Sequence, residues 1–292
     1  MSNSNTTESA IPLNDLIKAY ISGICYAVKF VQNKVVPILN GQINLSKREE
    51  AIRNTFFRIH ALCSSQTRLN HPMDFNAVAN NCRTIFELLL DLKLFSAGAS
   101  SDENIKKFHA FSKINRFRAA KKLIDFRIDN PNVISEAFTD NEILENCISN
   151  TDESELERQV YELWGKTKKG KPNWPTHWSG MSVRDRTKEY GAVYEQEYLE
   201  IYWMLSNNVH SGSAAYEGLT NDAIEAFYRV CLDISRKMYL ESLLICSAKF
   251  HFRESIKDFS KITEYIREAP TKILTRHVLN NISKLNSDKI KE

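Results

Sequence analysis

Residues 73–97, MDFNAVANNCRTIFELLLDLKLFSA, decide the fold class of this chain. Apolar side chains fill most of the stretch, and the polar ones recur at intervals of three and four. The polar positions are Asn76, Asn80, Arg83, Glu87 and Asp91. That spacing places them in one narrow stripe along an otherwise apolar helix. The stretch therefore predicts a helix that is buried over most of its surface.

The same apolar spacing continues in both directions from this helix. Nine Gly and seven Pro interrupt 292 residues, and no convincing alternating strand pattern is present. The sequence therefore predicts an all-α protein: one helical bundle with peripheral helices at both ends. The expected helices are 12–36 (halted by Pro37), 47–65, 73–97, 102–128, 132–148, 152–168, 183–190, 192–209, 220–252, 254–268 and 271–285.

We expect four segments along the chain. Residues 1–10 form a disordered tail, and 11–70 form N-terminal helices. Residues 71–252 make the core domain of the bundle, and 253–292 form polar amphipathic C-terminal helices. Ser182 is predicted to cap the helix that begins at Val183, with Asp185 in its first turn. Residues 166–181 are the one extended loop.

Composition excludes several classes of protein. Lys and Arg (39) nearly balance Asp and Glu (36), so no global field favours nucleic acid or membranes. The six cysteines show no metal-binding spacing, so we expect neither metal nor cofactor. There is no secretory signal and no run of 18 uncharged apolar residues, which predicts a cytoplasmic protein without membrane contact. Phosphate-binding loops, dinucleotide fingerprints, zinc-hydrolase motifs and nucleophile elbows are all missing.

The polar stripe of 73–97 has two interpretations. Arg83 and Glu87 are four residues apart, as in an ordinary ion pair on a solvent-facing helix. Alternatively the stripe faces a cleft, where Glu87 orients Arg83 toward an anionic ligand.

The helix predicted over 192–209 leads to a second candidate site. Ser206 and His210 lie one turn apart, and Tyr194, Tyr198 and Tyr202 follow a neighbouring stripe. Tyrosines at this spacing usually pack in a core. His210 suits either a helix cap, stabilised by the helix dipole, or a reactive site.

Two weaker signals remain. Arg53 and His60 match the loose Arg-x(4–6)-His motif of HEPN-type ribonucleases, although a chain of this composition is expected to contain such a match by chance. Lys169 lies in a loop with three further lysines (166, 168, 171), and tryptophans (164, 174, 178) are nearby. That loop is either a surface for single-stranded nucleic acid or a solvated loop with its tryptophans turned inward.

Several of these stretches resemble a known family. They are WSGMSVRDRTKEYG (178–191), the tyrosine series, LSNNVHS (205–211) and RTIFE (83–87). Together they are similar to a bacterial family catalogued as domain of unknown function 5677, over roughly residues 70–245. The resemblance implies a HEPN-like helical bundle. Proteins of that broad group often act as metal-independent ribonucleases in toxin–antitoxin or anti-phage systems.

Matched residue by residue, the resemblance points to Arg83, Glu87, Ser206 and His210. His210 has no upstream Arg in its own helix, because Leu205 and Ser206 stand there. A ribonuclease of this kind must then use Arg83 from another helix in place of that Arg, or use the Arg53–His60 pair instead.

Two functions follow. In the first, the protein is a metal-independent endoribonuclease, a toxin or anti-phage effector. His210 acts as general base or acid, Arg83 stabilises the phosphorane with Glu87 holding it, and Ser206 or Asn207 positions the phosphate. Tyr198 and Lys169 contact the RNA.

In the second, the protein is a non-catalytic helical module of a defence or regulatory complex. The matched residues then form a buried polar network. Its partner is an antitoxin or a complex subunit docked on 254–285, and a homodimer is compatible with either function.

Overall fold

The computed structural model describes residues 13–69, 71, 74–97, 101–132, 141–202, 205–206 and 221–268. Within these ranges the chain is helical and contains no strand beyond one isolated bridge. The all-α prediction is confirmed. The chain forms two compact units, residues 1–96 with 190–292, and residues 97–189. The segment boundaries predicted from the sequence stay predictions.

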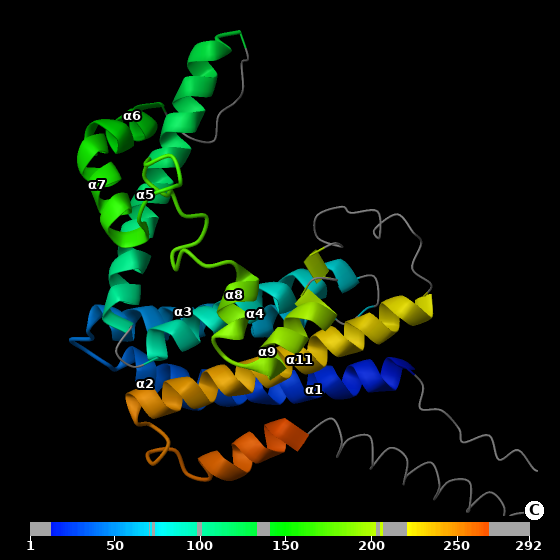
Figure 1. Cartoon of the computed structure of the whole chain (residues 1–292). Coiled ribbons are helices and arrows are strands. Elements are labelled where there is room, and N and C mark those ends of the chain that lie inside the picture. Colours follow the sequence, from blue (N-terminus) through cyan, green and yellow to red (C-terminus); the bar gives the residue numbers. More distant parts are fainter. Residues whose placement is uncertain are drawn as a thin grey trace, which may run out of the picture. The chain divides into compact units, whose positions relative to one another are not determined.

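Four long helices form the first unit (Figure 1). They are α1 (Leu13–Phe30), α3 (Lys47–Gln66), α4 (Phe75–Ser96) and α11 (Asn221–Phe250). α11 packs against the other three, and α3 also contacts α4 and α1. The mostly apolar helix predicted over 73–97 is therefore the central helix of this unit. It is α4, which buries twelve side chains, among them Ile85, Leu89 and Phe95. This unit is a helical bundle.

Shorter elements complete the first unit. α9 (Ala192–Glu197) continues into the π-helical turn η3 (Tyr198–Tyr202), and residues 205–206 are helical. Residues 259–268 form a further helix. Arg236 of α11 caps that helix, since its Nη1 donates to the carbonyl oxygens of Ile266 and Arg267 at 2.7 Å each. The expected helix over 271–285 lies outside the described residues.

The prediction that Pro37 halts the first helix was wrong. α1 passes into the π-helical turn η1 (Val31–Val35) and then into α2 (Val36–Asn40). Pro37 lies in the first turn of α2. A proline has no amide hydrogen to donate, and the first turn of a helix is where no donor is needed. The wider π-helical turn before it makes this restart compatible with a continuous helical path.

The second unit contains α5 (Ser101–Asp129), α6 (Asn141–Ser149), α7 (Glu153–Trp164) and α8 (Val183–Lys188). α5 contacts both α6 and α7. Its core consists of Ile114, Phe117, Leu156 and Val160, with Trp164 and Trp174 packed on them. The predicted cap of α8 is confirmed: the Asp185 amide donates to Ser182 Oγ at 3.1 Å. α7 ends at Trp164, four residues earlier than expected.

None of the helices described is both long enough and apolar enough to cross a membrane.

Candidate functional site

Arg83 and Glu87 of the polar stripe meet a tyrosine of η3. Arg83 Nη2 lies 3.3 Å from Glu87 Oε1 and donates to the hydroxyl of Tyr202 at 3.1 Å. That hydroxyl in turn donates to Glu87 Oε1 at 2.7 Å. The three side chains close a ring of polar contacts, which we call the Arg83 triad. The i,i+4 pair predicted from spacing exists, and a tyrosine 115 residues later joins it.

The Arg83 triad lies at the boundary of the core. The Arg83 and Glu87 side chains are 23% and 32% exposed, whereas Tyr202 is 8% exposed. Burial raises the pKa of Tyr202, and the bond to Glu87 raises it further, so its hydroxyl stays protonated. The guanidinium also lies 5.2 Å from the Tyr202 ring centre. The buried Tyr202 therefore holds the triad in place, while the Arg83 and Glu87 side chains stay partly exposed to solvent.

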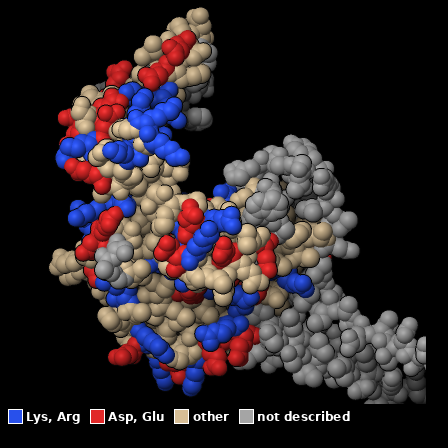
Figure 2. Space-filling view, viewed as in Figure 1, with Lys and Arg blue, Asp and Glu red and all other residues tan. Residues whose placement is uncertain are grey.

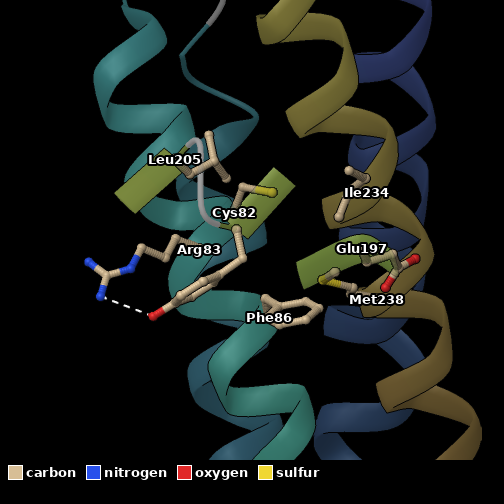
Figure 3. A pocket seen from close by; sticks show the side chains of 8 residues that line it. Cys82, Arg83, Phe86, Glu197, Leu205, Ile234 and Met238 are labelled. Carbon is tan, nitrogen blue, oxygen red and sulfur yellow. Dashed lines mark hydrogen bonds between the residues drawn. The ribbon is translucent and has the colours of Figure 1, made fainter. Parts of the chain in front are cut away.

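Arg83 is aimed away from the core beneath it. Figure 3 shows its guanidinium turned away from Phe86, Glu197 and Met238, with a hydrogen bond to a tyrosine hydroxyl. The buried Nε of Arg83 has no hydrogen-bond partner among the described residues. A guanidinium carries five donor hydrogens in a planar fork that suits phosphate oxygens. Part of that donor capacity remains unused here.

A second polar cluster lies further along α4 and joins it to α9 and α11. Lys93 of α4 contacts Glu241 Oε1 of α11 at 2.6 Å, and the Tyr194 hydroxyl donates to the same oxygen. The Lys93 ammonium also lies 4.3 Å from the Tyr194 ring centre and 5.2 Å from that of Tyr190. The tyrosine series thus runs antiparallel to α4, with Tyr202 near Arg83 and Tyr194 near Lys93.

The tyrosines of this series are mostly packing residues. Tyr198 and Tyr202 stack with ring centres 5.2 Å apart and planes 20° apart, and Tyr202 also packs on Phe86. Tyr198, predicted to bind substrate, is half-buried. In the described part of the chain its hydroxyl makes no hydrogen bond. Tyr202, not Tyr198, is therefore the tyrosine that bonds to Arg83 and Glu87 of the polar stripe.

One hollow borders the Arg83 triad, and a separate cleft has no residue of the triad in its lining. The hollow is apolar, holds about 10 Å³ and is lined by residues that include Cys82, Phe86, Leu205 and Met238 (Figure 3), which is room for one water molecule. The cleft is open, has a volume of about 460 Å³ and lies on the side of α11. Charged side chains line that cleft: Glu197, Glu200, Arg229, Asp233 and Lys237. Burial and the nearby Glu241 raise the pKa of Glu197.

The Arg53–His60 pair is built differently from a reactive site. His60 is 8% exposed, and both ring nitrogens are engaged. Nδ1 lies 2.5 Å from the Tyr239 hydroxyl, and Nε2 lies 3.0 Å from Gln32 Oε1. Burial lowers the pKa of His60. The ring therefore joins three helical elements as a neutral hydrogen-bonding group.

The other predicted site residues are dispersed. Ser206 is half-buried beside the buried Leu205. Asn207 and His210 lie outside the described residues. Lys169 is exposed in the second unit. Trp178 there is 3% exposed, and Trp164 and Trp174 pack on the core, so the tryptophans of that loop do turn inward. Among the residues described, no three His, Cys, Asp or Glu side chains gather as metal ligands would.

Sequence reasoning missed the roles of Tyr202, Glu197 and Glu241. The tyrosine spacing was a usable signal, because Tyr202 and Tyr194 share one helix face. Which tyrosine meets a charged partner depends on the register between two helices distant in sequence. The sequence carries no direct signal for that register.

The fold and the triad define an all-helical bundle protein with a half-exposed arginine on its central helix. A family model described as "Family of unknown function (DUF5677)" matches residues 49–225, and the chain belongs to this family. Neither a curated protein nor a solved structure matches the chain. The likeness to HEPN domains stays a prediction.

Proposed function

We propose that this protein is a metal-independent endoribonuclease that acts as a toxin or anti-phage effector. One observation carries the proposal. Arg83 is held by a carboxylate and a phenol hydroxyl, and its side chain is partly exposed, so its guanidinium can reach an anion. Preorganised donors of this kind stabilise the charge that develops on a phosphorane.

The proposed reaction is transesterification within the RNA. The ribose 2′-oxygen bonds to phosphorus, the bond to the 5′-oxygen breaks, and the 2′ proton is removed while the leaving oxygen gains one. The products are a 2′,3′-cyclic phosphate and a 5′-hydroxyl, and neither water nor metal is consumed. His210 is the proposed general base or acid. Arg83 binds the phosphate, Glu87 and Tyr202 position Arg83, and Ser206 with Asn207 contacts the same phosphate.

A second candidate function has its own support. Tyr202 is buried and bonds to both Arg83 and Glu87, as expected of a polar network that sets the register of two packed helices. In that case the protein is a non-catalytic helical module that binds a protein partner. The two functions differ in whether the exposed part of Arg83 contacts RNA.

RNA cleavage without metal tests the proposal. We expect the full chain to cleave RNA in excess EDTA and to leave 2′,3′-cyclic phosphate ends. Arg83→Gln should slow cleavage by about 100- to 1,000-fold, the effect typical of losing one such donor. The matched control is Arg58→Gln, since Arg58 is an exposed arginine of α3 and makes no ion pair within the described structure. Growth arrest on expression should follow the same order.

Tyr202→Phe separates a catalytic role from a structural one. It removes the hydroxyl that joins Arg83 to Glu87 and keeps the ring. If Arg83 binds the phosphate, the rate falls while circular dichroism and substrate affinity change little. The proposal is refuted if wild type leaves RNA intact in EDTA, or if folded Arg83→Gln cleaves as fast as Arg58→Gln.

A further inference from the structure

The loop after α7 is a fixed hairpin. Lys166 and Pro172 form an antiparallel bridge. The Thr167 amide donates to the Lys171 carbonyl at 2.8 Å, and the Gly170 amide donates to the Thr167 carbonyl at 2.9 Å, which closes a tight turn. The Asn173 amide donates to the Gly165 carbonyl at 3.0 Å. We call residues 166–171 the lysine hairpin.

The base of the lysine hairpin is anchored on both sides. Trp164 precedes it, and its Nε1 donates to the Trp178 carbonyl at 2.9 Å. Trp174 follows it, and both Trp164 and Trp174 pack on the core of the second unit. Arg118 of α5 lies 5.6 Å from the Trp174 ring centre. Because the backbone is already ordered, binding through this hairpin costs less conformational entropy than binding through a free loop.

The charge of the hairpin is uncompensated. Lys166, Lys168, Lys169 and Lys171 are all exposed. No described carboxylate pairs with any of them, and residues 163–176 contain neither Asp nor Glu.

Three other cations of the same unit pair with carboxylates. Lys107 contacts Glu103 at 2.6 Å, Lys121 contacts Glu153 at 2.5 Å, and Arg158 bonds Glu155 at 2.8 Å. Figure 2 shows Lys and Arg side chains (blue) gathered on part of the second unit. The lysine hairpin therefore concentrates positive charge that the fold itself does not use.

We propose that the lysine hairpin binds the phosphate backbone of RNA, without regard to sequence. Lysine ammonium groups are mobile point charges that attract phosphates, and contacts to phosphates carry no sequence information. Trp178 is buried, and the partly buried Trp164 and Trp174 pack on the core, so little ring surface is left on which bases could stack. The choice of RNA over other polyanions rests on the proposed ribonuclease function.

The hairpin lacks the exposed apolar side chains that insert into a membrane or form the centre of a protein interface. The exposed large apolar side chains of the described structure include none between residues 164 and 178. Membrane docking uses such side chains to enter the lipid, and protein interfaces use them at their centre. A patch of charge without apolar surface fits a phosphate backbone best.

Binding to an RNA that cannot be cleaved tests this proposal. We would measure fluorescence anisotropy of a labelled 20-nucleotide 2′-O-methyl RNA with the full chain at several salt concentrations. In the test variant all four hairpin lysines are changed to Gln. We expect its affinity at about 0.1 M salt to fall at least tenfold, and the slope of log K against log salt to become shallower by about 2 to 3.

The control variant removes the same charge elsewhere. Lys29, Lys34, Lys47 and Lys257 are exposed and belong to the first unit. Their replacement by Gln should change RNA affinity less than twofold. The proposal is overturned if the two variants bind RNA equally, or if wild type does not bind the RNA. It is also overturned if the hairpin variant loses only binding to phosphatidylserine vesicles.

The two proposals fail separately. RNA binding that depends on the hairpin, without cleavage in EDTA, retains the lysine hairpin and removes the ribonuclease. Cleavage that depends on Arg83, with unchanged RNA binding by the hairpin variant, does the reverse.

Discussion

His60 shows how packing decides the state of a single side chain. Its sequence context matched a ribonuclease motif, yet both ring nitrogens bond to partners in other helices. Nε2 donates to Gln32 Oε1, and Nδ1 pairs with the Tyr239 hydroxyl, which can donate to the neutral ring. Burial lowers the pKa of His60 below its ordinary value of 6.5, consistent with that assignment. The histidine is therefore a structural element of α3, and its partners could not be read from residues 53–60.

This lowered pKa predicts a dependence of stability on pH. The unfolded state binds a proton at a higher pH than the folded state does, so the contribution of His60 is complete above about pH 6.5 and is lost as the pH falls. Between pH 7 and pH 5, wild type should lose more unfolding free energy than His60→Gln does. Urea unfolding at both pH values measures the difference. The control is His251→Asn, at an exposed site with positive φ that Asn tolerates; if it changes the pH dependence as much, burial of His60 is not the cause.

At the scale of elements, sequence patterns predicted the helices well and their contacts poorly. Helices α3, α4 and α5 begin and end within two residues of the predicted limits. Apolar periodicity and caps such as Ser182 are local signals, and the helices that they predict are present in the folded protein. Two helix ends differ from the prediction. The helical path continues past Pro37 through a π-helical turn, and α7 ends early at Trp164, which packs on the core of its unit. Both features depend on neighbouring elements. The spacing of Arg83 and Glu87 predicted their ion pair, whereas Tyr202 came from a distant helix.

Replacing one glycine of the loop that joins α7 to α8 is expected to lower stability strongly. Gly180 has φ +75°, and a Cβ there would lie 2.8 Å from Trp164 Cδ1. Gly180→Ala therefore adds a clash with a packed indole to backbone strain, and should lower the unfolding free energy of this unit by about 2–4 kcal/mol. Gly170→Ala is the matched control, with the same φ and no atom within 4 Å. Urea unfolding followed by tryptophan fluorescence should separate the variants by more than about 1 kcal/mol; equal losses would mean that the Trp164 contact is unimportant.

At the scale of the whole molecule, the chain has two cores. One is built by α1, α3, α4 and α11, and the other by α5, α6 and α7. Residues 97–189 form the second unit as an insertion between α4 and α9. The candidate Arg83 triad belongs to the first unit and the lysine hairpin to the second. The two proposals therefore address separate compact units.

Separate cores predict separate sensitivity to mutation. Leu156 is fully buried in the second unit, and Leu89 is fully buried in the first. Each change to Ala should cost about 2–5 kcal/mol in its own unit. Three of the four tryptophans, Trp164, Trp174 and Trp178, lie in the second unit, and Trp203 lies in the first. Leu156→Ala should therefore lower the urea midpoint seen by tryptophan fluorescence more than the midpoint seen by far-UV circular dichroism. Leu89→Ala should do the reverse. Equal shifts with both probes would show a single cooperative unit.

The sequence alone determined the all-helical class, the limits of helices such as α3, α4 and α5, and the Arg83–Glu87 pair, because periodicity, caps and i,i+4 spacing act within a few turns of chain. Tertiary structure alone decided that Tyr202 completes the triad, that His60 is neutral and engaged, and that the four hairpin lysines stay unpaired while neighbouring cations find carboxylates. These outcomes depend on helix register and on which side chains share a surface. Register between distant helices is a property of the whole packed core, and no local pattern encodes it.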